Sequence, residues 1–315
     1  MSRSPRVVAL GGGHGLAASL RALRHVTRDL TAVVTVADDG GSSGRLRGQF
    51  GALPPGDLRM ALAALSGHDQ WGGTWSQVLQ HRFGGEGDLS GHAVGNLLIV
   101  ALWEICGDPV AGLDYVGRLV GAEGRVLPMS AVPLDVGAEI TRIVDGEEWR
   151  TTIRGQAHVA AAAGHVNKIW LSPPDAPACA EAVAAVREAD WVVLGPGSWY
   201  TSVIPHLLID ELAAAVTSPS VRRLVTLNLT DQGGETSGFT ACDHIRALAE
   251  YLGGASLDVV IADPDRVDNE ANLRRLVSGL GAELLIRPVR KKDSTAVHDS
   301  VLLAAAYREA FTRVR

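Results

Sequence analysis

Residues 6–24, RVVALGGGHGLAASLRALR, place a short apolar strand, a glycine-rich turn and an amphipathic helix in direct succession. Leu16, Leu20 and Leu23 recur at the spacing of one helical face, which identifies the element after the glycines as a helix. The next run, 30–37 (LTAVVTVA), is nearly apolar on both faces, as buried parallel strands are. The start of the chain therefore predicts an open, mostly parallel α/β sheet with helices on both faces.

The alternation of strand and helix continues along the chain with one interruption. Further strands are expected at 168–171, 191–194, 223–227, 257–262 and 283–286, and helices at 58–65, 97–106, 176–188, 207–216, 244–252, 269–280 and 295–312. From 124 to 155 apolar and polar residues alternate instead, around an Asp-Gly turn at 145–146, which predicts a small β-meander. We expect residues 1–315 to form a single α/β domain that carries 124–155 as an inserted β element.

Composition limits the class of protein. Hydrophobic residues make up 46% of the chain and charged residues 20%, which is too apolar for a disordered protein. The net charge of −6 argues against non-specific nucleic-acid binding, which needs a basic surface. Three scattered cysteines and the lack of an apolar leader indicate a cytoplasmic protein. The most apolar run, 97–105, is too short to span a bilayer, so no membrane insertion is expected.

The first glycine-rich turn lies between a strand and a helix and consists of Gly11, Gly12, Gly13, His14 and Gly15. There, small residues let backbone N–H groups and the positive end of the helix approach an anion, usually a phosphate. The alternative is a tight turn without a ligand. The G-x-G-x-x-G dinucleotide fingerprint is incomplete, because leucine follows the last glycine. We interpret the turn as a phosphate site, in which His14 is as compatible with an ordinary loop residue as with a catalytic one.

A second candidate loop follows the strand at 30–37 and combines acids with anion-binding groups: Asp38, Asp39, Gly40, Gly41, Ser42, Ser43 and Arg45. An acid at this point can hold a ribose hydroxyl, and paired carboxylates can instead hold Mg²⁺, which bridges phosphates. Alternatively, the acids only stabilise an Asx turn. Glycine, serine and arginine suit a diphosphate, although Arg45 could equally lie on a solvated helix start. We assign the acids to a ribose or a metal, and 40–45 to a diphosphate.

Further candidates precede helices or follow strands. Asp57, in PPGD, can join the two acids as a metal ligand or simply cap a helix, and Arg59 is equally ambiguous. His92 and Asn96 lead into an apolar helix, where Asn96 needs a polar partner. A third glycine loop and the end of the next strand add Gly195, Pro196, Gly197, Ser198, Thr201, Ser202 and Asn228. Polar glycine loops at several strand ends favour one shared ligand site.

Several catalytic motifs do not occur in the sequence. It contains no G-x-x-x-x-G-K-[ST], no G-x-S-x-G and no H-E-x-x-H, and its histidines are too dispersed to indicate a zinc site. We therefore assign no catalytic residue. A reaction at this site would be phosphoryl or phosphodiester transfer, in which positioning and charge neutralisation by Mg²⁺ do most of the catalysis.

Together these motifs resemble the gluconeogenesis factor family (YvcK-type), the regulatory branch of the CofD-like superfamily. The matching segments occur in family order and cover nearly the whole chain: VVALGGGHGLAASLRAL, AVVTVADDGGSSGRLR, PPGDLRMALAAL, LSGHAVGNLLIVAL, GRVLPMS, ADWVVLGPGSWYTSVIPHLLI and DQGGETSGFTACDHI. His14 stands where many members have Thr or Ser, and Gln232-Gly-Gly replaces the commoner Gln-Pro-Gly. The resemblance therefore does not fix the role of position 14.

The resemblance implies a Rossmann-like α/β fold and a UDP-sugar ligand such as UDP-N-acetylglucosamine or UDP-glucose, with no other cofactor required. It also implies a role in cell shape and in growth on gluconeogenic carbon sources, protein targets in cell-wall (peptidoglycan) precursor synthesis, and a homodimer. The related 2-phospho-L-lactate transferase moves a phospholactyl group from a nucleotide-diphosphate donor to a deazaflavin with Mg²⁺. The metal acids of that enzyme match Asp38 or Asp39, and Asp57.

These observations leave three hypotheses. A nucleotide-sugar-binding regulator and a Mg²⁺-dependent transferase share one pocket and differ in whether a reaction occurs there. A transferase needs room for an acceptor beside GGSSGRLR, whereas a regulator can fill that loop with ligand contacts. An NAD(P)-dependent oxidoreductase is disfavoured by the incomplete fingerprint. We favour the regulator, for which Thr295 and Thr312 are candidate phosphorylation sites.

Overall fold

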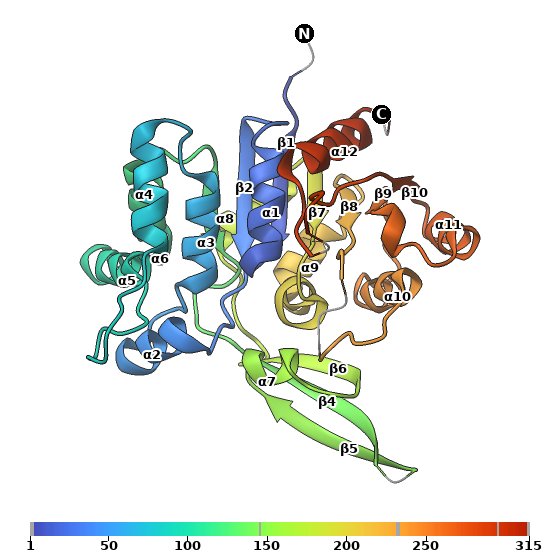
Figure 1. Ribbon diagram of the computed structural model, residues 1–315, viewed down its shortest axis with the longest axis horizontal. Coiled ribbons are helices and arrows are strands. Elements are labelled where there is room, and N and C mark those ends of the chain that lie inside the picture. Colours follow the sequence, from blue (N-terminus) through green and yellow to red (C-terminus); the bar gives the residue numbers. More distant parts are fainter. Residues whose placement is uncertain (1–2, 145, 231–233, 295, 314–315) are drawn as a thin grey trace.

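The computed structural model describes residues 3–144, 146–230, 234–294 and 296–313, and its centre is a seven-stranded parallel sheet (Figure 1). The strand order is β10-β9-β8-β7-β1-β2-β3. The strands span β1 (Arg6–Gly11), β2 (Asp29–Val34), β3 (Arg125–Pro128), β7 (Trp191–Leu194), β8 (Arg222–Thr226), β9 (Val259–Ala262) and β10 (Glu283–Ile286). Strands β1, β7 and β9 are buried along nearly all their length, because helices cover both faces of these apolar runs.

Helices cover both faces of the sheet. They span α1 (Gly13–Leu23), α2 (Gly41–Phe50), α3 (Gly56–Leu65), α4 (Gln70–Gln80), α5 (Val94–Cys106), α6 (Pro109–Leu119), α7 (Gln156–Ala160), α8 (Ala180–Glu188), α9 (Asp210–Val216), α10 (Ala241–Tyr251), α11 (Glu270–Gly279) and α12 (Ser300–Arg313). Helix α1 packs against α3 and α12, whereas α8 packs against α9 (Figure 1). The crossover from β1 through α1 to β2 and the crossover from β7 through α9 to β8 run in opposite directions across the sheet, so right-handed connections put their helices on opposite faces. The Rossmann-like α/β fold expected from the sequence is confirmed.

The chain reverses its direction across the sheet between β1 and β7. Strands β2 and β3 lie on one side of β1, and β7 to β10 lie on the other. Open α/β sheets bind ligands outside the carboxyl ends of their strands, at such a switch point. The glycine-rich segments at 11–15, 38–45 and 195–198 follow β1, β2 and β7, so all three reach this edge of the sheet.

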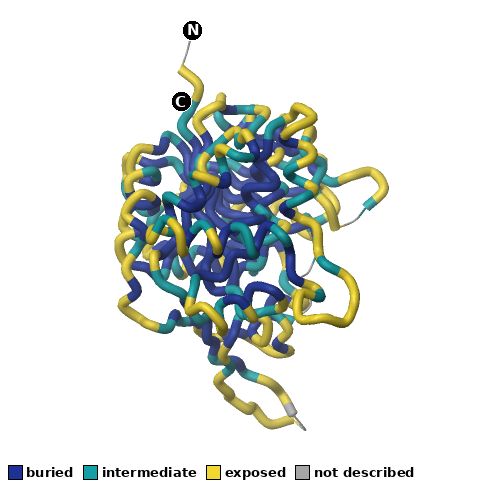
Figure 2. Tube along the Cα trace, turned by 90° about the vertical axis from the view of Figure 1, so that its left-hand side faces the viewer, coloured by how far each residue is buried: buried dark blue, intermediate teal, exposed yellow. Residues whose placement is uncertain are grey.

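A second, antiparallel sheet extends from the body of the molecule (Figures 1 and 2). Its strands, in the order β5-β4-β6, span β4 (Asp135–Val144), β5 (Glu147–Arg154) and β6 (His165–Ser172). We call these strands and α7 the arm. The sequence analysis expected the insertion at 124–155, but β3 pairs in parallel with β2, and 168–171 belongs to the small sheet. A strand as short as β3 shows too little alternation to reveal which sheet it joins.

The sequence analysis did not identify α4 or α6, and it assigned 40–45 to a loop where the structure has the start of α2. Glycine-rich α2 has poor intrinsic helix propensity. It forms because Ser42, Ser43 and Leu46 are buried and the helix packs against α5, so tertiary contact overrides propensity. In the described part of the chain, no helix has both the length and the apolar character that crossing a membrane requires.

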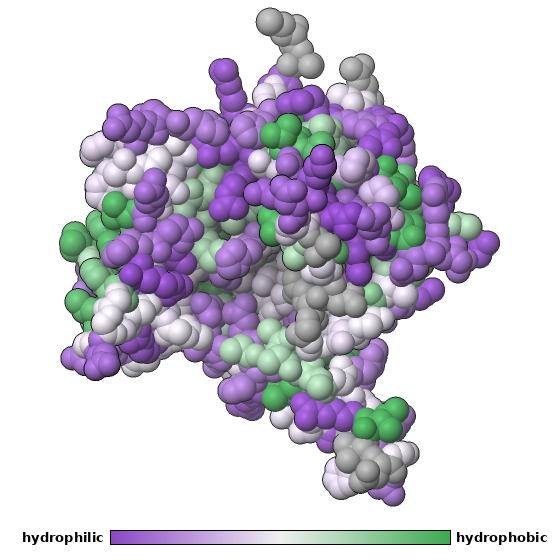
Figure 3. Space-filling view, viewed as in Figure 1, coloured by the Kyte–Doolittle hydropathy of each residue, from purple (hydrophilic) through white to green (hydrophobic). Residues whose placement is uncertain are grey.

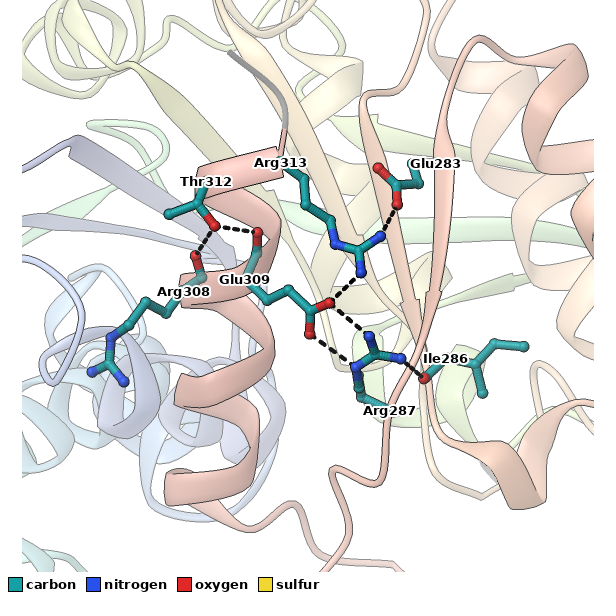
Figure 4. Close-up of polar contacts among 7 residues, drawn as sticks. All are labelled: Glu283, Ile286, Arg287, Arg308, Glu309, Thr312 and Arg313. Carbon is teal, nitrogen blue, oxygen red and sulfur yellow. Dashed lines mark hydrogen bonds and ion pairs between the residues drawn. The ribbon is translucent and has the colours of Figure 1, made fainter.

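Ion pairs fasten α12 to the edge strand β10 (Figure 4). Glu309 accepts hydrogen bonds from Arg287 at 2.6 and 2.8 Å and from Arg313 at 2.6 Å, and these bonds lower the pKa of Glu309. On the same helix, the exposed Thr312 hydroxyl donates to backbone carbonyls one turn back. Of the two threonines named as phosphorylation candidates, Thr295 lies outside the described residues.

Candidate functional site

The loops after β1 and β7 touch at the switch point. A Cβ atom on Gly15 would lie 2.3 Å from the Pro196 carbonyl oxygen and 2.6 Å from Gly197 Cα, so only glycine fits there. Asn228, after β8, holds the second loop through two hydrogen bonds to Gly197: Nδ2 donates to the carbonyl at 2.9 Å, and Oδ1 accepts from the amide at 2.8 Å. The predicted residues Gly15, Pro196, Gly197 and Asn228 thus hold the two loops together, and we call this contact the glycine cradle.

The N-terminus of α1 faces a carboxylate. Helix α1 begins at Gly13, and Gly12 provides no side-chain cap. The Gly13 N–H donates to Asp57, which lies in the first turn of α3 but does not cap that helix. A Cβ on Gly12 would lie 2.4 Å from Asp57 Oδ2. Asp57 thus occupies the positive end of α1, the kind of position that also attracts phosphate.

Asp38 and Asp57 form an acidic pair. Asp38 Oδ1 accepts from the Gly40 amide at 3.0 Å, and a Cβ on Gly56 would lie 3.0 Å from Asp38 Oδ2. Burial and the Asp38 carboxylate raise the pKa of Asp57 to about 7, although the Gly13 N–H opposes this shift. Two close carboxylates can share a proton, or they can hold Mg²⁺ together with phosphate oxygens. The donor set of Asp38 and Asp57 fits such an ion.

The structure separates Asp39 from this pair. Asp39 Oδ1 accepts from the Ala157 amide at 3.1 Å, and a Cβ on Gly155 would lie 2.2 Å from Asp39 Oδ2. Asp39 therefore faces the arm, whereas the Asp38 carboxylate lies close enough to Asp57 to raise the pKa of that group. Two of the three predicted metal acids are therefore brought together. Within the described residues, no group of three or more His, Cys, Asp or Glu is placed to hold a metal.

Four predicted residues form a buried hydrogen-bond chain between α2, α3 and α5. Ser42 Oγ lies 3.0 Å from His92 Nδ1 and accepts from Asn96 Nδ2 at 3.0 Å. Arg59 Nε donates to Asn96 Oδ1 at 2.9 Å. Burial lowers the pKa of His92, and it lowers that of Arg59 to about 10. Asn96 thus has the polar partners that its apolar surroundings required.

Replacing Asn96 with alanine is expected to lower the free energy of unfolding by about 1–3 kcal/mol, because buried groups of Arg59 and Ser42 lose their partner. Asn167→Ala removes an exposed amide on β6 and should cost less than about 0.5 kcal/mol. Urea unfolding followed by circular dichroism measures both variants. Equally small effects would show that the buried chain does not contribute to stability.

Several hydroxyl groups that we expect to contact a ligand also take part in hydrogen bonds within the protein. Ser43 Oγ accepts from the Gly56 amide at 3.0 Å. Ser198 Oγ lies 2.5 Å from Thr201 Oγ1, and both Thr201 and Ser202 are buried. These hydrogen bonds help to fix the loops, and the contact of the hydroxyl groups with a ligand stays a prediction.

Arg45 lies away from the cradle. Its guanidinium donates to the carbonyl of Ser90 at 2.7 Å and to that of Asp88 at 3.4 Å, and the side chain is exposed. Its role as a diphosphate clamp stays a prediction. The start of α2 has no side-chain cap at Gly40, so backbone N–H groups of its first turn are available to an anion.

A pocket of about 540 Å³ opens beside the cradle, within the usual range for small-molecule sites. The predicted residues His14, Gly15, Gly197 and Asn228 contribute to its lining. Among the further lining residues that the sequence analysis missed, three are titratable: Arg21, Lys291 and His298. Burial lowers the pKa of His298 to about 4, so Arg21 and Lys291 supply the positive charge. The basic run at 290–292 was the one sequence feature that could have indicated this side of the pocket. Its position in the sequence does not show that it lies at the carboxyl edge of the sheet.

Glu235 is a second buried carboxyl that the sequence analysis missed. It is 1% exposed and accepts from the Ser198 hydroxyl and, at 3.3 Å, from the Tyr200 amide. Burial raises its pKa to about 7. Because no apolar strand leads directly into Glu235, the rule that ligand residues follow strands could not find it.

Comparison with known proteins gives the family. The family described as "2-phospho-L-lactate transferase CofD" matches residues 7–283. A "Putative gluconeogenesis factor" from Mycobacterium tuberculosis is 49% identical over 302 residues, which cover 95% of this chain and 88% of that protein. The "Gluconeogenesis factor" of Bacillus subtilis is 35% identical over 270 residues, 86% of this chain and 82% of that protein.

A solved structure has the same fold. The crystal structure of a UPF0052 family member from Bacillus halodurans matches with a TM-score of 0.84 and 33% identity, and the match covers 97% of this chain and 99% of that one. The family match, the identity to gluconeogenesis factors and this structural likeness all extend over most of the sequence. The chain belongs to the CofD family.

Proposed function

We propose that the protein binds a UDP-sugar, such as UDP-N-acetylglucosamine or UDP-glucose, at the carboxyl edge of the sheet. It acts as a regulator that links carbon metabolism to cell-wall synthesis and cell shape. One observation carries this proposal: the loops after β1 and β7 form a tight glycine cradle at the switch point, beside a cationic pocket. The name gluconeogenesis factor, carried by relatives, supports the regulatory part.

Each part of the site suits one part of such a ligand. Backbone N–H groups at the start of α1, apart from that of Gly13, which donates to Asp57, are suited to a diphosphate. Arg21 and Lys291 offset the ligand's negative charge, and the pocket they line has room for the nucleoside or the sugar. Asp38 and Asp57 would hold a Mg²⁺, which would offset the negative charge of the diphosphate. Without such an ion, the Asp57 carboxylate would repel the diphosphate.

A Mg²⁺-dependent transferase is the second candidate, and the acidic pair favours it. The raised pKa of Asp57 suits a group that exchanges a proton or a metal near neutral pH. The same arrangement can neutralise the charge that develops during transfer from a nucleotide-diphosphate donor. Ser42 and Ser43 at the start of α2 are buried and so are not open to an acceptor, which favours the regulator over an enzyme that needs an acceptor there.

Isothermal titration calorimetry with UDP-N-acetylglucosamine, UDP-glucose, GDP and NAD tests the proposal. We expect a UDP-sugar to bind more tightly than GDP or NAD, and Asp38→Ala to weaken binding in the presence of Mg²⁺. Arg45→Ala, at the exposed end of the same segment, tests whether the diphosphate extends along α2. Absence of binding by any UDP-sugar at millimolar concentration would contradict the proposal. Turnover of a labelled nucleotide donor with Mg²⁺ would favour the transferase.

A further inference from the structure

Strand β5 is an exposed edge of the arm. It pairs with β4 on one side only, and its side chains are almost all exposed, including Trp149 at 58%. Ile143 on the neighbouring β4 is 77% exposed. Figure 2 shows the arm standing clear of the body, and Figure 3 shows hydrophobic surface near its end. The unpaired backbone groups of such an edge readily pair with another strand.

Strand β5, EEWRTTIR, can pair antiparallel with a second copy of itself so that residues of opposite charge face each other. In an antiparallel pair related by a two-fold axis, opposite residues share one face, so the axis must pass midway between the two copies of one residue. With the axis at Thr151, Glu148 lies opposite Arg154, and Trp149 lies opposite Ile153. Each pair occurs twice. Opposite charges and aromatic–β-branched pairs are cross-strand contacts that stabilise sheets.

The arginines exclude the adjacent registers. With the axis at Arg150, the Arg150 residues of the two copies lie opposite each other. With the axis at Thr152, Arg150 of one copy lies opposite Arg154 of the other. Like charges directly opposite each other are destabilising. An axis at Trp149 pairs Glu148 with Arg150, but it sets the end of β5 opposite the hairpin turn instead of another strand. The charges on β5, together with the need to face another strand and not the turn, favour the register centred on Thr151, in which every residue of the strand except Glu147 is paired.

We propose that two copies of this chain associate through β5, antiparallel and centred on Thr151, and so join their arms into one continuous sheet. In this dimer, the unpaired edge of β5 in each copy is covered by β5 of the other copy. Gly155 and Ala157, which contact Asp39, follow β5 directly, so the dimer also fixes the part of the arm that borders the ligand site. The proposal does not depend on which ligand binds there.

Sedimentation velocity of the full chain, from micromolar to millimolar concentration, tests this pairing. The wild type should form dimers. Glu148→Arg and Arg154→Glu should each weaken self-association by about tenfold or more, because each replaces two attractive pairs with repulsive ones. An equimolar mixture of the two variants should associate again, since every facing pair is then of opposite charge. The double variant should also dimerise.

Arg150→Glu is the matched control, because it makes the same change of charge on the same strand but faces Thr152 in the proposed register. It should leave the dimer intact. Unchanged thermal unfolding of all variants shows that these exposed substitutions leave the fold intact. A wild type that stays monomeric throughout overturns the proposal. Loss of the dimer in Arg150→Glu but not in Arg154→Glu overturns the register in favour of an axis at Trp149.

Discussion

Gly15→Ala is expected to lower the free energy of unfolding by about 1–3 kcal/mol and to abolish measurable binding of a UDP-sugar. The new Cβ would overlap the backbone of Pro196 and Gly197, at 2.3 and 2.6 Å. That backbone cannot easily move away, because Asn228 holds Gly197 through two hydrogen bonds. The loops after β1 and β7 must therefore separate, which distorts the cradle. Urea unfolding and calorimetry measure the two effects.

Gly48→Ala is the control for this substitution. Gly48 lies within α2, and a Cβ there would meet nothing within 4 Å. Alanine should raise stability by up to about 1 kcal/mol, because glycine is a poor helix former. Wild-type stability and binding in Gly15→Ala would show that the two loops do not form the contact on which the site depends.

Asp57→Asn is expected to remove the pH dependence of UDP-sugar binding near neutrality. Without Mg²⁺, ionisation of Asp57 above its pKa of about 7 places negative charge at the positive end of α1. The affinity of the wild type should then fall by up to about tenfold per pH unit. With Mg²⁺ the ionised carboxylate holds the metal, so affinity should rise with pH instead. Calorimetry at about pH 6 and about pH 8, with and without Mg²⁺, should show both trends in the wild type and neither in the variant.

The same substitution should change how stability depends on pH. Folding raises the pKa of Asp57, so the folded state binds this proton more tightly than the unfolded state. The resulting stabilisation is fully present below the ordinary pKa of 3.8 and is lost as pH rises from there to about 7. Asp57→Asn should therefore gain in melting temperature, relative to the wild type, as pH increases, whereas exposed Asp293→Asn should show no such trend. A constant difference between Asp57→Asn and wild type at all pH values would contradict a raised pKa.

The sequence predicted the parallel sheet and the glycine-rich loops at the ends of its strands because both depend on local patterns. Apolar runs such as 191–194 can be recognised as buried strands, and the glycines that follow them must lie at the carboxyl edge. The arm was harder to delimit, since β6 alternates weakly and pairs with β4 across many residues of sequence. Helix α2 was missed because burial, not composition, stabilises it.

The contacts within the site could be identified only from the tertiary structure. The sequence could not show that Asp38 faces Asp57 while Asp39 faces the arm, because a small change in backbone direction at a strand end decides which way each side chain points. Lys291 follows the last strand of the sheet, far in sequence from His14, yet both line one pocket. Such pairs depend on how distant segments pack, which no local pattern encodes.

The most direct test of the central claim is a crystal structure of the chain with UDP-N-acetylglucosamine and Mg²⁺. We expect the diphosphate to accept hydrogen bonds from backbone N–H groups at the start of α1, with the metal between it and the carboxylates of Asp38 and Asp57. The nucleoside or the sugar should occupy the pocket beside Lys291. A UDP-sugar bound elsewhere, with the glycine cradle between β1 and β7 left free, would contradict the account.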